Sequence, residues 1–502
     1  MPRVKIDGTE YEVEDGRTIL QALDDLGLLM NGVDVPHYCW HPKLPVDGSC
    51  RLCQVEVDDI PKLQIACNTP IRDGMEVRTQ SDRVADARRG VMELLLVNHP
   101  LDCPICDQAG ECKLQDYAFD YGVKHARTRD PRRPAQKAVE LGPEIVFDQE
   151  RCILCRRCVR FCRDVTGTAE LGVFQRGDES LLETFPGKPL DNAYSMNVAD
   201  ICPVGALTTR DFRFKIRVWF LDDVDSVCNQ CSNGCNISAG RAHNNVYRFT
   251  PRRNDDVNDT WMCDAGRLSY PALREGRLET AQLRGRSVAF NEAVAAAGAA
   301  LRETREAGGR IVGIGSPFAP NEDLFTLREL LGAVGAGPGL FSVPLGAGDD
   351  ILIKPEKAPN AAGARALGFV ESGDVGDAAL AIVLGHAAAG DALSSVENVI
   401  LIDTHDSALA SRAMVALPAR TFAERAGTFT NHAKRVQRFL PFLEPRFEAW
   451  AEGDILTRLA ASAGLDTDAW DVNAVSKRLS QEVPAFEGID LDSVGDRGLE
   501  LR

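Results

Sequence analysis

The pattern of apolar and polar residues predicts a small mixed domain at the start of the chain. Alternating positions indicate short strands at 4–6 and 11–13, joined by an Asp-Gly step that favours a tight hairpin. Thr18 and Gln21 stand three residues apart, in the register of a capping box. We therefore expect a hairpin and then a helix in this segment.

Two further segments in the first half of the chain have readable patterns. Residues 84–97 show helical periodicity, with Leu94 and its apolar neighbours on a face that we expect to be buried. Strands are expected at 237–239 and 246–249, joined by a polar turn at Asn244-Asn245.

From about residue 273 the chain is rich in Ala and Gly, and strand-like segments alternate with helix-like ones. This alternation predicts an α/β domain. Continuous apolar runs at 379–385 and 398–403 predict buried parallel strands. Segment 310–315 leads into Gly-Ile-Gly-Ser, where a simple tight turn is favoured over a phosphate-binding turn because a lone G-x-G is weak evidence.

Composition narrows the class of protein. A chain of 502 residues with 44% hydrophobic and 26% charged residues is typical of a soluble protein of several domains. Its net charge of -17 argues against nucleic-acid binding, which needs a basic surface. The polar start lacks a secretory signal, and no apolar run approaches the roughly 20 residues that span a bilayer. We expect a cytoplasmic protein that meets a membrane only through partner subunits.

The cysteines carry the clearest chemical signal. All 16 lie between Cys39 and Cys263, so the last 239 residues of the chain have none. Such a cysteine count in a secreted chain would suggest disulfides, but the uneven distribution along this chain is typical of metal-centre ligands. Most of these cysteines fall into four sets with regular spacing.

The first set is Cys39, Cys50, Cys53 and Cys67, spaced C-x10-C-x2-C-x13-C. Four thiolates from one long loop and one later element can hold a [2Fe–2S] cluster. Gly48 before the central pair suits a backbone that curls and directs amide groups at sulfur. The alternative is a four-cysteine zinc site, which usually has two C-x2-C pairs.

The second set is His99, Cys103, Cys106 and Cys112, spaced H-x3-C-x2-C-x5-C. A zinc site with three cysteines and one histidine is again the alternative to a [4Fe–4S] cluster. Replacing one thiolate with a neutral imidazole makes a cluster less negative, which tends to raise its potential.

The third set is Cys152, Cys155 and Cys158, with Cys162 and the more distant Cys202 as competing fourth ligands. In two-cluster bacterial ferredoxins, each C-x2-C-x2-C-x3-C run gives its fourth cysteine to the other cluster. By this rule a second triad would occupy positions 192, 195 and 198, which hold Asn, Ser and Val. The pattern favours one retained [4Fe–4S] cluster with Cys202 as its fourth ligand and leaves Cys162 over.

Five arginines surround the third set: Arg151, Arg156, Arg157, Arg160 and Arg163. Positive charge near a net-negative cluster stabilises its reduced form. For most of the five, a solvated face or a docking patch is an equally good interpretation.

The fourth set is Cys228, Cys231, Cys235 and Cys263, spaced C-x2-C-x3-C-x27-C. Because the other three sets look like cluster sites, a [4Fe–4S] cluster is favoured here too. Zinc is a more credible alternative for this set than for the others.

With four sets in this order, the chain resembles the family of large iron–sulfur subunits (G subunits) of bacterial NADH:quinone oxidoreductase, respiratory complex I. The first three sets also occur in related hydrogenases and NAD-linked formate dehydrogenases, and the fourth is similar to an extra cluster that some complex I subunits keep. The resemblance covers residues 1 to about 270. It is weaker afterwards, where the stretch 417–437 looks like the molybdopterin-oxidoreductase fold.

The resemblance implies an α+β multidomain architecture. Its expected parts are a β-grasp [2Fe–2S] ferredoxin domain (1–78), a helical segment with a histidine-ligated [4Fe–4S] cluster (79–119), a bacterial-ferredoxin-like [4Fe–4S] domain (140–215), a fourth [4Fe–4S] domain of molybdopterin-oxidoreductase type (220–272) and a truncated α/β molybdopterin-oxidoreductase-like domain (273–502).

The resemblance also implies electron transfer. A flavin subunit would oxidise NADH, and clusters in this chain would pass electrons towards quinone-proximal iron–sulfur subunits on the inner face of the plasma membrane, as part of a peripheral arm. The first three clusters would form the relay, with the fourth too far away to take part. The chain itself would be an electron carrier without a substrate site.

The last domain is expected to be an inactive scaffold without molybdopterin. Active relatives have a lysine two residues after the last cysteine of the fourth set, and this chain has Ala265 there. A metal-ligating cysteine further on is also absent.

Two other classes of function remain open. A catalytic hydrogenase would need a further cysteine set, and a formate dehydrogenase would contain molybdenum. A zinc-scaffolded assembly protein would be colourless, whereas the favoured function predicts a brown protein.

Overall fold

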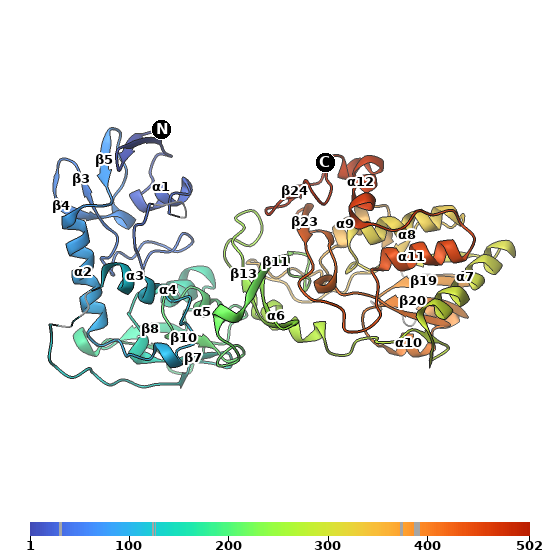
Figure 1. Ribbon diagram of the computed structural model, residues 1–502, viewed down its shortest axis with the longest axis horizontal. Coiled ribbons are helices and arrows are strands. Elements are labelled where there is room, and N and C mark those ends of the chain that lie inside the picture. Colours follow the sequence, from blue (N-terminus) through green and yellow to red (C-terminus); the bar gives the residue numbers. More distant parts are fainter. Residues whose placement is uncertain (30–32, 123–124, 126, 372–374, 386–391) are drawn as a thin grey trace. The chain divides into compact units, whose positions relative to one another are not determined.

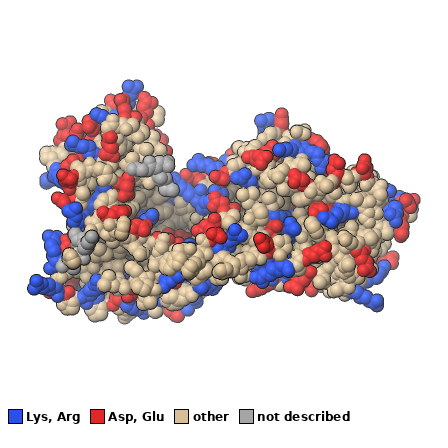
Figure 2. Space-filling model, in the orientation of Figure 1, with Lys and Arg blue, Asp and Glu red and all other residues tan. Residues whose placement is uncertain are grey.

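The computed structural model describes residues 1–29, 33–122, 125, 127–371, 375–385 and 392–502 (Figure 1). The chain divides into two compact units, Met1–Leu221 and Asp222–Arg502. Within the described ranges, no helix combines the length and the apolar character that a membrane span requires. On the face drawn in Figure 2, acidic and basic side chains are interspersed, in line with an ordinary solvated surface.

The first unit begins with a mixed five-stranded sheet. Its strands are β1 (Arg3–Ile6), β2 (Thr9–Glu12), β3 (Gln54–Val57), β4 (Ile60–Ile65) and β5 (Met75–Arg78), in the order β2-β1-β5-β3-β4. Asp7 and Gly8 form the hairpin turn with φ of 45° and 87°, as predicted. Helix α1 (Ile19–Asp25) starts at the predicted capping box of Thr18 and Gln21. This is the expected β-grasp topology, and its core packs α1 against the sheet.

The rest of the first unit consists of short elements joined by long loops. Its helices are α2 (Asp82–Leu96), α3 (Lys113–Tyr121), α4 (Arg157–Arg160) and α5 (Asn197–Asp200). Its strands are β6 (Val139–Glu140), β7 (Ile145–Phe147), β8 (Leu171–Phe174), β9 (Leu181–Thr184) and β10 (Leu207–Thr209). Single helical turns occur at Ala66–Asn68, Cys103–Ile105, Gln149–Arg151, Phe161–Val165, Gly177–Glu179 and Val218–Phe220.

Helix α2 buries a different face from the one expected. Its buried residues are Val84, Arg88 and Met92, which recur every four residues and so share one stripe. Leu94 is 76% exposed because it lies two positions from Met92, on the opposite side of the helix. The expectation of a buried Leu94 was wrong.

The second unit begins with an antiparallel sheet of β11 (Asp222–Val227), β12 (Asn236–Ala242) and β13 (Asn245–Pro251), followed by the short helix α6 (Asp264–Arg267). His243 and Asn244 form the turn between β12 and β13, with φ of 50° and 59°. The expected turn at Asn244-Asn245 was therefore one residue late, because Asn245 already pairs with Ala242.

An eight-stranded sheet forms the centre of the second unit. Its strands are β14 (Gln282–Leu283), β15 (Arg286–Ser287), β16 (Ile311–Ile314), β17 (Leu340–Phe341), β18 (Val370–Glu371), β19 (Leu380–Leu384), β20 (Asn398–Asp403) and β21 (Val415–Pro418). The order is β15-β14-β21-β20-β19-β16-β17-β18, and the six strands from β21 to β18 are parallel. The buried parallel strands expected at 379–385 and 398–403 are confirmed.

Hydrophobic cores lie on both faces of this sheet. Leu380 and Ile382 of β19 belong to one core and Ala381 and Val383 to the other, because successive side chains of a strand point to opposite faces.

The helices of the second unit after α6 are α7 (Phe290–Glu306), α8 (Asn321–Ala333), α9 (Ala361–Ala366), α10 (Ala408–Arg412), α11 (Glu452–Ser462) and α12 (Val472–Glu482). Single turns occur at Tyr270–Leu273, Ala392–Ser395, Phe422–Glu424 and Pro484–Phe486, and a small sheet contains β22 (Gly427–Thr430), β23 (Arg435–Phe439) and β24 (Leu499–Glu500).

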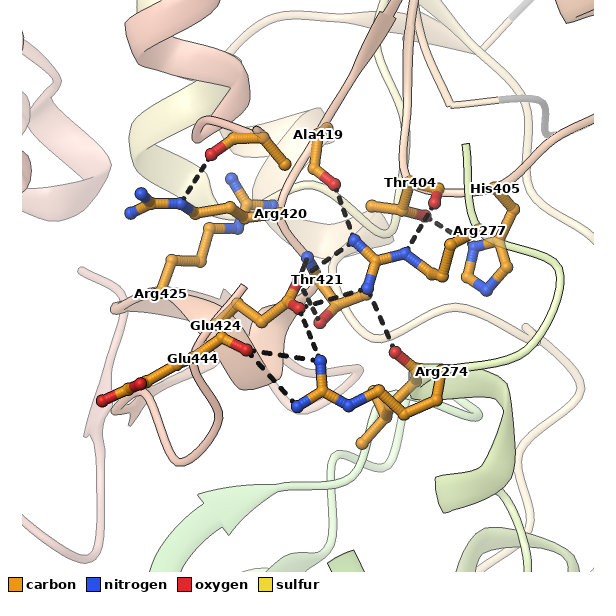
Figure 3. A network of polar contacts seen from close by, with 12 residues as sticks. Arg274, Arg277, Thr404, His405, Ala419, Arg420, Thr421, Glu424, Arg425 and Glu444 are labelled. Carbon is orange, nitrogen blue, oxygen red and sulfur yellow. Dashed lines mark hydrogen bonds and ion pairs between the residues drawn. The ribbon is translucent and has the colours of Figure 1, made fainter. Parts of the chain in front are cut away.

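A buried ion pair joins the segment after α6 to the large sheet at the carboxyl ends of β20 and β21 (Figure 3). Arg277 forms a two-pronged pair with Glu424, at 3.0 and 3.2 Å, and both side chains are almost fully buried. The same guanidinium donates to the carbonyl oxygens of Thr404 and Ala419, which follow β20 and β21. Arg274 adds a second contact to Glu424. The network therefore joins three segments that are distant in sequence.

We expect Arg277→Met to lower the free energy of unfolding of the second unit by about 3–5 kcal/mol, because it leaves the buried Glu424 carboxylate without its main partner. Urea denaturation, with hydrogen exchange of the β19–β21 amides as the local readout, measures this change. Arg310→Met is the control, since Arg310 pairs with Asp377 at the surface and its loss should leave stability unchanged. Equal stability of the two variants would contradict the structural role of the network.

Candidate iron–sulfur sites

The four cysteines of the first set lie close together in the first unit. Cys39, Cys53 and Cys67 are buried and Cys50 is partly buried. The sulfur of Cys39 hydrogen-bonds with those of Cys50 and Cys67, which lowers the pKa of Cys39, while the same contact raises the pKa of Cys50. Cys53 also pairs with Cys67. All four sulfurs are thus within one small volume.

The loop of the first set curls as its sequence suggests. Gly48 has a φ of 69°, in the left-handed region that glycine adopts without strain. The amides of Ser49 and Cys50 donate to the Cys39 sulfur, and the amide of Leu52 donates to Cys50. Amide donors of this kind stabilise the negative charge of thiolates and of a cluster bound to them.

The second set lies around the start of α3. Cys106 and Cys112 are buried, whereas Cys103 is exposed. Cys112 is the N-cap residue of α3, and the nearby amides of Leu114 and Gln115 oppose the rise in its pKa that burial causes. The charges of Cys103 and Cys106 both act on Cys112, so the three thiols lie close together.

His99 has the state that metal ligation requires. Its Nδ1 atom is buried, and the described residues offer it no hydrogen-bond partner. Burial, followed by the charge of Arg151, lowers the pKa of His99 to about 4, so the imidazole is neutral at pH 7. Arg151 also acts on Cys106, so His99 and Cys106 both lie near the same guanidinium.

The third set surrounds a cavity in the first unit. This cavity is lined by Cys152, Cys155, Cys158 and Cys202, with apolar side chains that include Phe147 and Leu207. The Cys152 sulfur accepts from the amide of Leu154 at 3.4 Å. Three further amides donate to Cys202, where burial raises the pKa to about 12. The donor set is thus four sulfurs around a space walled by apolar groups.

Cys162 does not line this cavity and has other partners. Its side chain hydrogen-bonds with Glu170, and burial, followed by the charge of Glu170, raises its pKa. Glu170 also accepts from Asn192 at 2.9 Å and from Thr168. Asn192 occupies one of the positions that a second triad would need, so hydrogen-bonded side chains fill this region.

The second and third sets share one backbone segment. Gly205, three residues after Cys202, packs so closely on Cys106 that a Cβ atom at Gly205 would lie 2.2 Å from the Cys106 sulfur. The carbonyl of Pro203 lies 3.9 Å from the Cys112 sulfur. The segment 202–205 therefore contacts both sets. The close packing of Gly205 was not predicted from the sequence, although a glycine soon after a ligand-like Cys-Pro pair was a visible signal.

Three of the five arginines near the third set are shielded from solvent rather than solvated. Arg151 and Arg160 are buried, and Arg157 is partly buried with its Nε atom shielded. Arg156 and Arg163 pair with acidic residues at the surface. The surface interpretation therefore applies only to the last two.

The fourth set lies between β11, β12 and α6 in the second unit. Cys228, Cys231 and Cys235 are buried, and Cys263 caps α6, where its sulfur accepts from the Gly266 amide at 3.3 Å. A Cβ atom at Gly266 would lie 3.1 Å from the Cys228 sulfur and 3.3 Å from that of Cys263, so only hydrogen fits comfortably there. Burial raises the pKa of Cys235 to about 12, and Asn233 donates to its sulfur at 3.1 Å.

Next to the fourth set, the second unit has a cavity of about 230 Å³ at the carboxyl ends of the parallel strands. Its lining includes Gln230, Ser316, Asp403 and Arg425. The carbonyl of Ser316 accepts from the Ala319 amide at 3.0 Å, so the Gly-Ile-Gly-Ser segment leads into the tight turn that was favoured.

Five family models match the chain. They are the 2Fe-2S iron-sulfur cluster binding domain (2–82), the NADH-ubiquinone oxidoreductase-G iron-sulfur binding region (88–127), the ferredoxin-like domain of NADH-quinone oxidoreductase subunit 3 (142–208), the NDSU1/NuoG-like 4Fe-4S domain of NADH-ubiquinone oxidoreductase (221–271) and molybdopterin oxidoreductase (367–462). The chain thus contains a 2Fe-2S domain, 4Fe-4S domains and a molybdopterin oxidoreductase domain in a mixed α/β architecture.

Curated relatives match about two thirds of the chain. The G subunit of the NADH-quinone oxidoreductase of Rickettsia conorii is 38% identical over 340 residues, which are 67% of this chain and 50% of the relative. The mitochondrial NADH-ubiquinone oxidoreductase 78 kDa subunit of Candida albicans is 37% identical over 340 residues, 66% of this chain and 46% of the relative. The mitochondrial NADH dehydrogenase [ubiquinone] iron-sulfur protein 1 of Solanum tuberosum is 37% identical over 338 residues, 66% of this chain and 45% of the relative.

Among solved structures, a chain of an NAD+-reducing [NiFe]-hydrogenase in the H2-reduced state is 30% identical with a TM-score of 0.38, and the match covers 43% of this chain and 91% of that chain. This chain spans about half the length of the curated relatives that it matches. Over the matched two thirds, the chain is a relative of the large iron–sulfur subunit, the G subunit, of NADH:quinone oxidoreductase.

Proposed function

We propose that this chain is an electron-transfer subunit of an NADH:quinone oxidoreductase, with one [2Fe–2S] cluster at the first set and one [4Fe–4S] cluster at each of the other three. The observation that carries the proposal is the convergence of each set on one place, with amides directed at its sulfurs. Clusters bound there supply one-electron reduction and oxidation. The protein's own part is to hold, shield and electrostatically tune them.

The contacts between sets support a relay in the first unit. Arg160 contacts carbonyls of the first and third sets, and the segment 202–205 contacts the third and second sets. An electron would pass from the first set through the third to the second. The exposed Cys103 marks the second set as the end open to a partner.

The partners we propose follow from the relatives. A flavin-containing subunit that oxidises NADH would donate the electrons, and quinone-proximal iron–sulfur subunits would receive them. The site of action would be the inner face of the plasma membrane.

The proposed domains are those given above, 1–78, 79–119, 140–215, 220–272 and 273–502, and the last would be a scaffold without molybdopterin. An NAD-linked formate dehydrogenase or hydrogenase is the second candidate.

Metal analysis of the anaerobically purified chain tests this function. We expect a brown protein with about 14 iron atoms per chain and EPR signals on reduction, because the clusters contain two, four, four and four irons. Iron-poor, zinc-rich and colourless material would contradict it. Stoichiometric molybdenum would instead favour the formate dehydrogenase candidate.

Paired alanine variants test the fourth ligand of the third set. We expect Cys202→Ala to remove that cluster, about four irons per chain, because Cys202 lines the cavity with the other three sulfurs. Cys162→Ala should keep the full iron content, since Cys162 bonds to Glu170 outside the cavity. EPR and iron analysis provide the measurement, and the reverse result would make Cys162 the ligand.

We expect Gly205→Ala to disrupt the second site, because its methyl group would overlap the Cys106 sulfur. The iron content should fall from about 14 to about 10 per chain, with the EPR signal of one [4Fe–4S] cluster lost. Gly90→Ala is the matched control, since Gly90 lies in α2 with open space around its Cα atom. Retention of all the iron in Gly205→Ala would show that the segment 202–205 does not constrain this site.

A further inference from the structure

Two arginines of α4 connect the first and third cysteine sets. Arg160 is 4% exposed, and one of its terminal nitrogens, Nη2, donates both to the carbonyl of Cys39 and, at 3.4 Å, to the carbonyl of Cys155. Its other terminal nitrogen, Nη1, donates to the carbonyl of Pro45. One guanidinium therefore contacts a residue of each set directly.

Arg157 makes a second connection one turn earlier in α4. Its guanidinium donates to the carbonyl of Trp40, next to Cys39, and at 3.1 Å to the carbonyl of Ile201, next to Cys202. Its charge interacts with the sulfurs of Cys155, Cys202 and Cys39. Arg157 thus also lies between the two sets.

The hydrogen bonds of these arginines leave their charge uncompensated. Every hydrogen bond that the described structure gives to the two guanidiniums ends on a backbone carbonyl, which has no net charge. The charge of Arg160 helps to lower the pKa of the Asp164 carboxylate, but Asp164 forms its ion pair with Arg163, at 2.8 Å. A shielded cation without a paired carboxylate is costly unless negative charge lies nearby. The two sulfur sets supply that negative charge.

We propose that Arg157 and Arg160 are positioning residues shared by the first and third sets, which raise the reduction potentials of both bound clusters and fix the distance between them. The inference rests on the proposed function, since it concerns clusters at these two sets. Reduction of either cluster adds one negative charge, which a neighbouring guanidinium stabilises. The electron that leaves one site is the electron gained at the other, and no proton moves because both guanidiniums stay charged.

The test is an EPR-monitored redox titration of the complete chain with its clusters, for the wild type and variants. We expect Arg157→Met to lower the potentials of both clusters, each by about 59 mV, the equivalent of a tenfold loss of electron affinity for a one-electron couple. Arg157→Lys keeps the charge and should keep both potentials near those of the wild type. Arg163→Met is the control, because Arg163 is 58% exposed and pairs with its neighbour, and it should change neither potential.

The outcomes separate this inference from the proposed function. A wild-type chain without the two EPR signals would refute the proposed function itself. Unchanged potentials in Arg157→Met, with iron content retained, would overturn the shared role, and a shift at only one cluster would overturn the sharing. If Arg157→Met fails to assemble, Arg160→Lys and Arg157→Lys decide. Retained clusters with potentials near wild type support the role of charge, whereas cluster loss or shifted potentials despite the retained charge contradict it.

Discussion

Long loops that carry cysteines place many backbone carbonyls away from water, and shielded arginines supply the hydrogen-bond donors that these carbonyls need. Arg157 and Arg160 do this between the first and third sets, and the partly buried Arg217 donates to the carbonyls of Cys106 and of the exposed Pro104 in the second set. Arg277 does the same at the edge of the large sheet in the second unit. A guanidinium suits this task because it offers five donors in a fixed plane.

Local sequence signals were sufficient where one short segment determines the structure. The Asp7-Gly8 hairpin, the capping box of Thr18 and the apolar strands at 379–385 and 398–403 each depend on neighbouring residues, and each was predicted correctly. Cysteine spacing likewise predicted sulfurs that lie close together in the first and third sets, and their role as cluster ligands stays a prediction. The preference for Cys202 over Cys162 came from a rule about paired motifs, and the cavity lined by Cys202 agrees with it.

Features that depend on contacts between distant segments were not accessible. The buried stripe of α2 is decided by what packs on it, so Leu94 could not be placed from periodicity alone. The arginines near the third set look alike in the sequence, but only some of them face carbonyls of another loop. The close approach of Gly205 to Cys106 joins residues about a hundred positions apart, and only the folded chain reveals it.

The short stretch from Cys202 to Gly205 limits the distance between the third set and the residue that packs on the second set. Three peptide steps span at most about 11 Å between Cα atoms, so the points at which this stretch belongs to the third set and packs on the second set lie within that distance of each other. The contacts of Gly205 with Cys106 and of Pro203 with Cys112 are non-covalent, so the short stretch keeps the two sets close for as long as this packing holds. Because the probability of tunnelling falls steeply with separation, this short span would keep the electron hops that we propose between the two sites uniform from molecule to molecule.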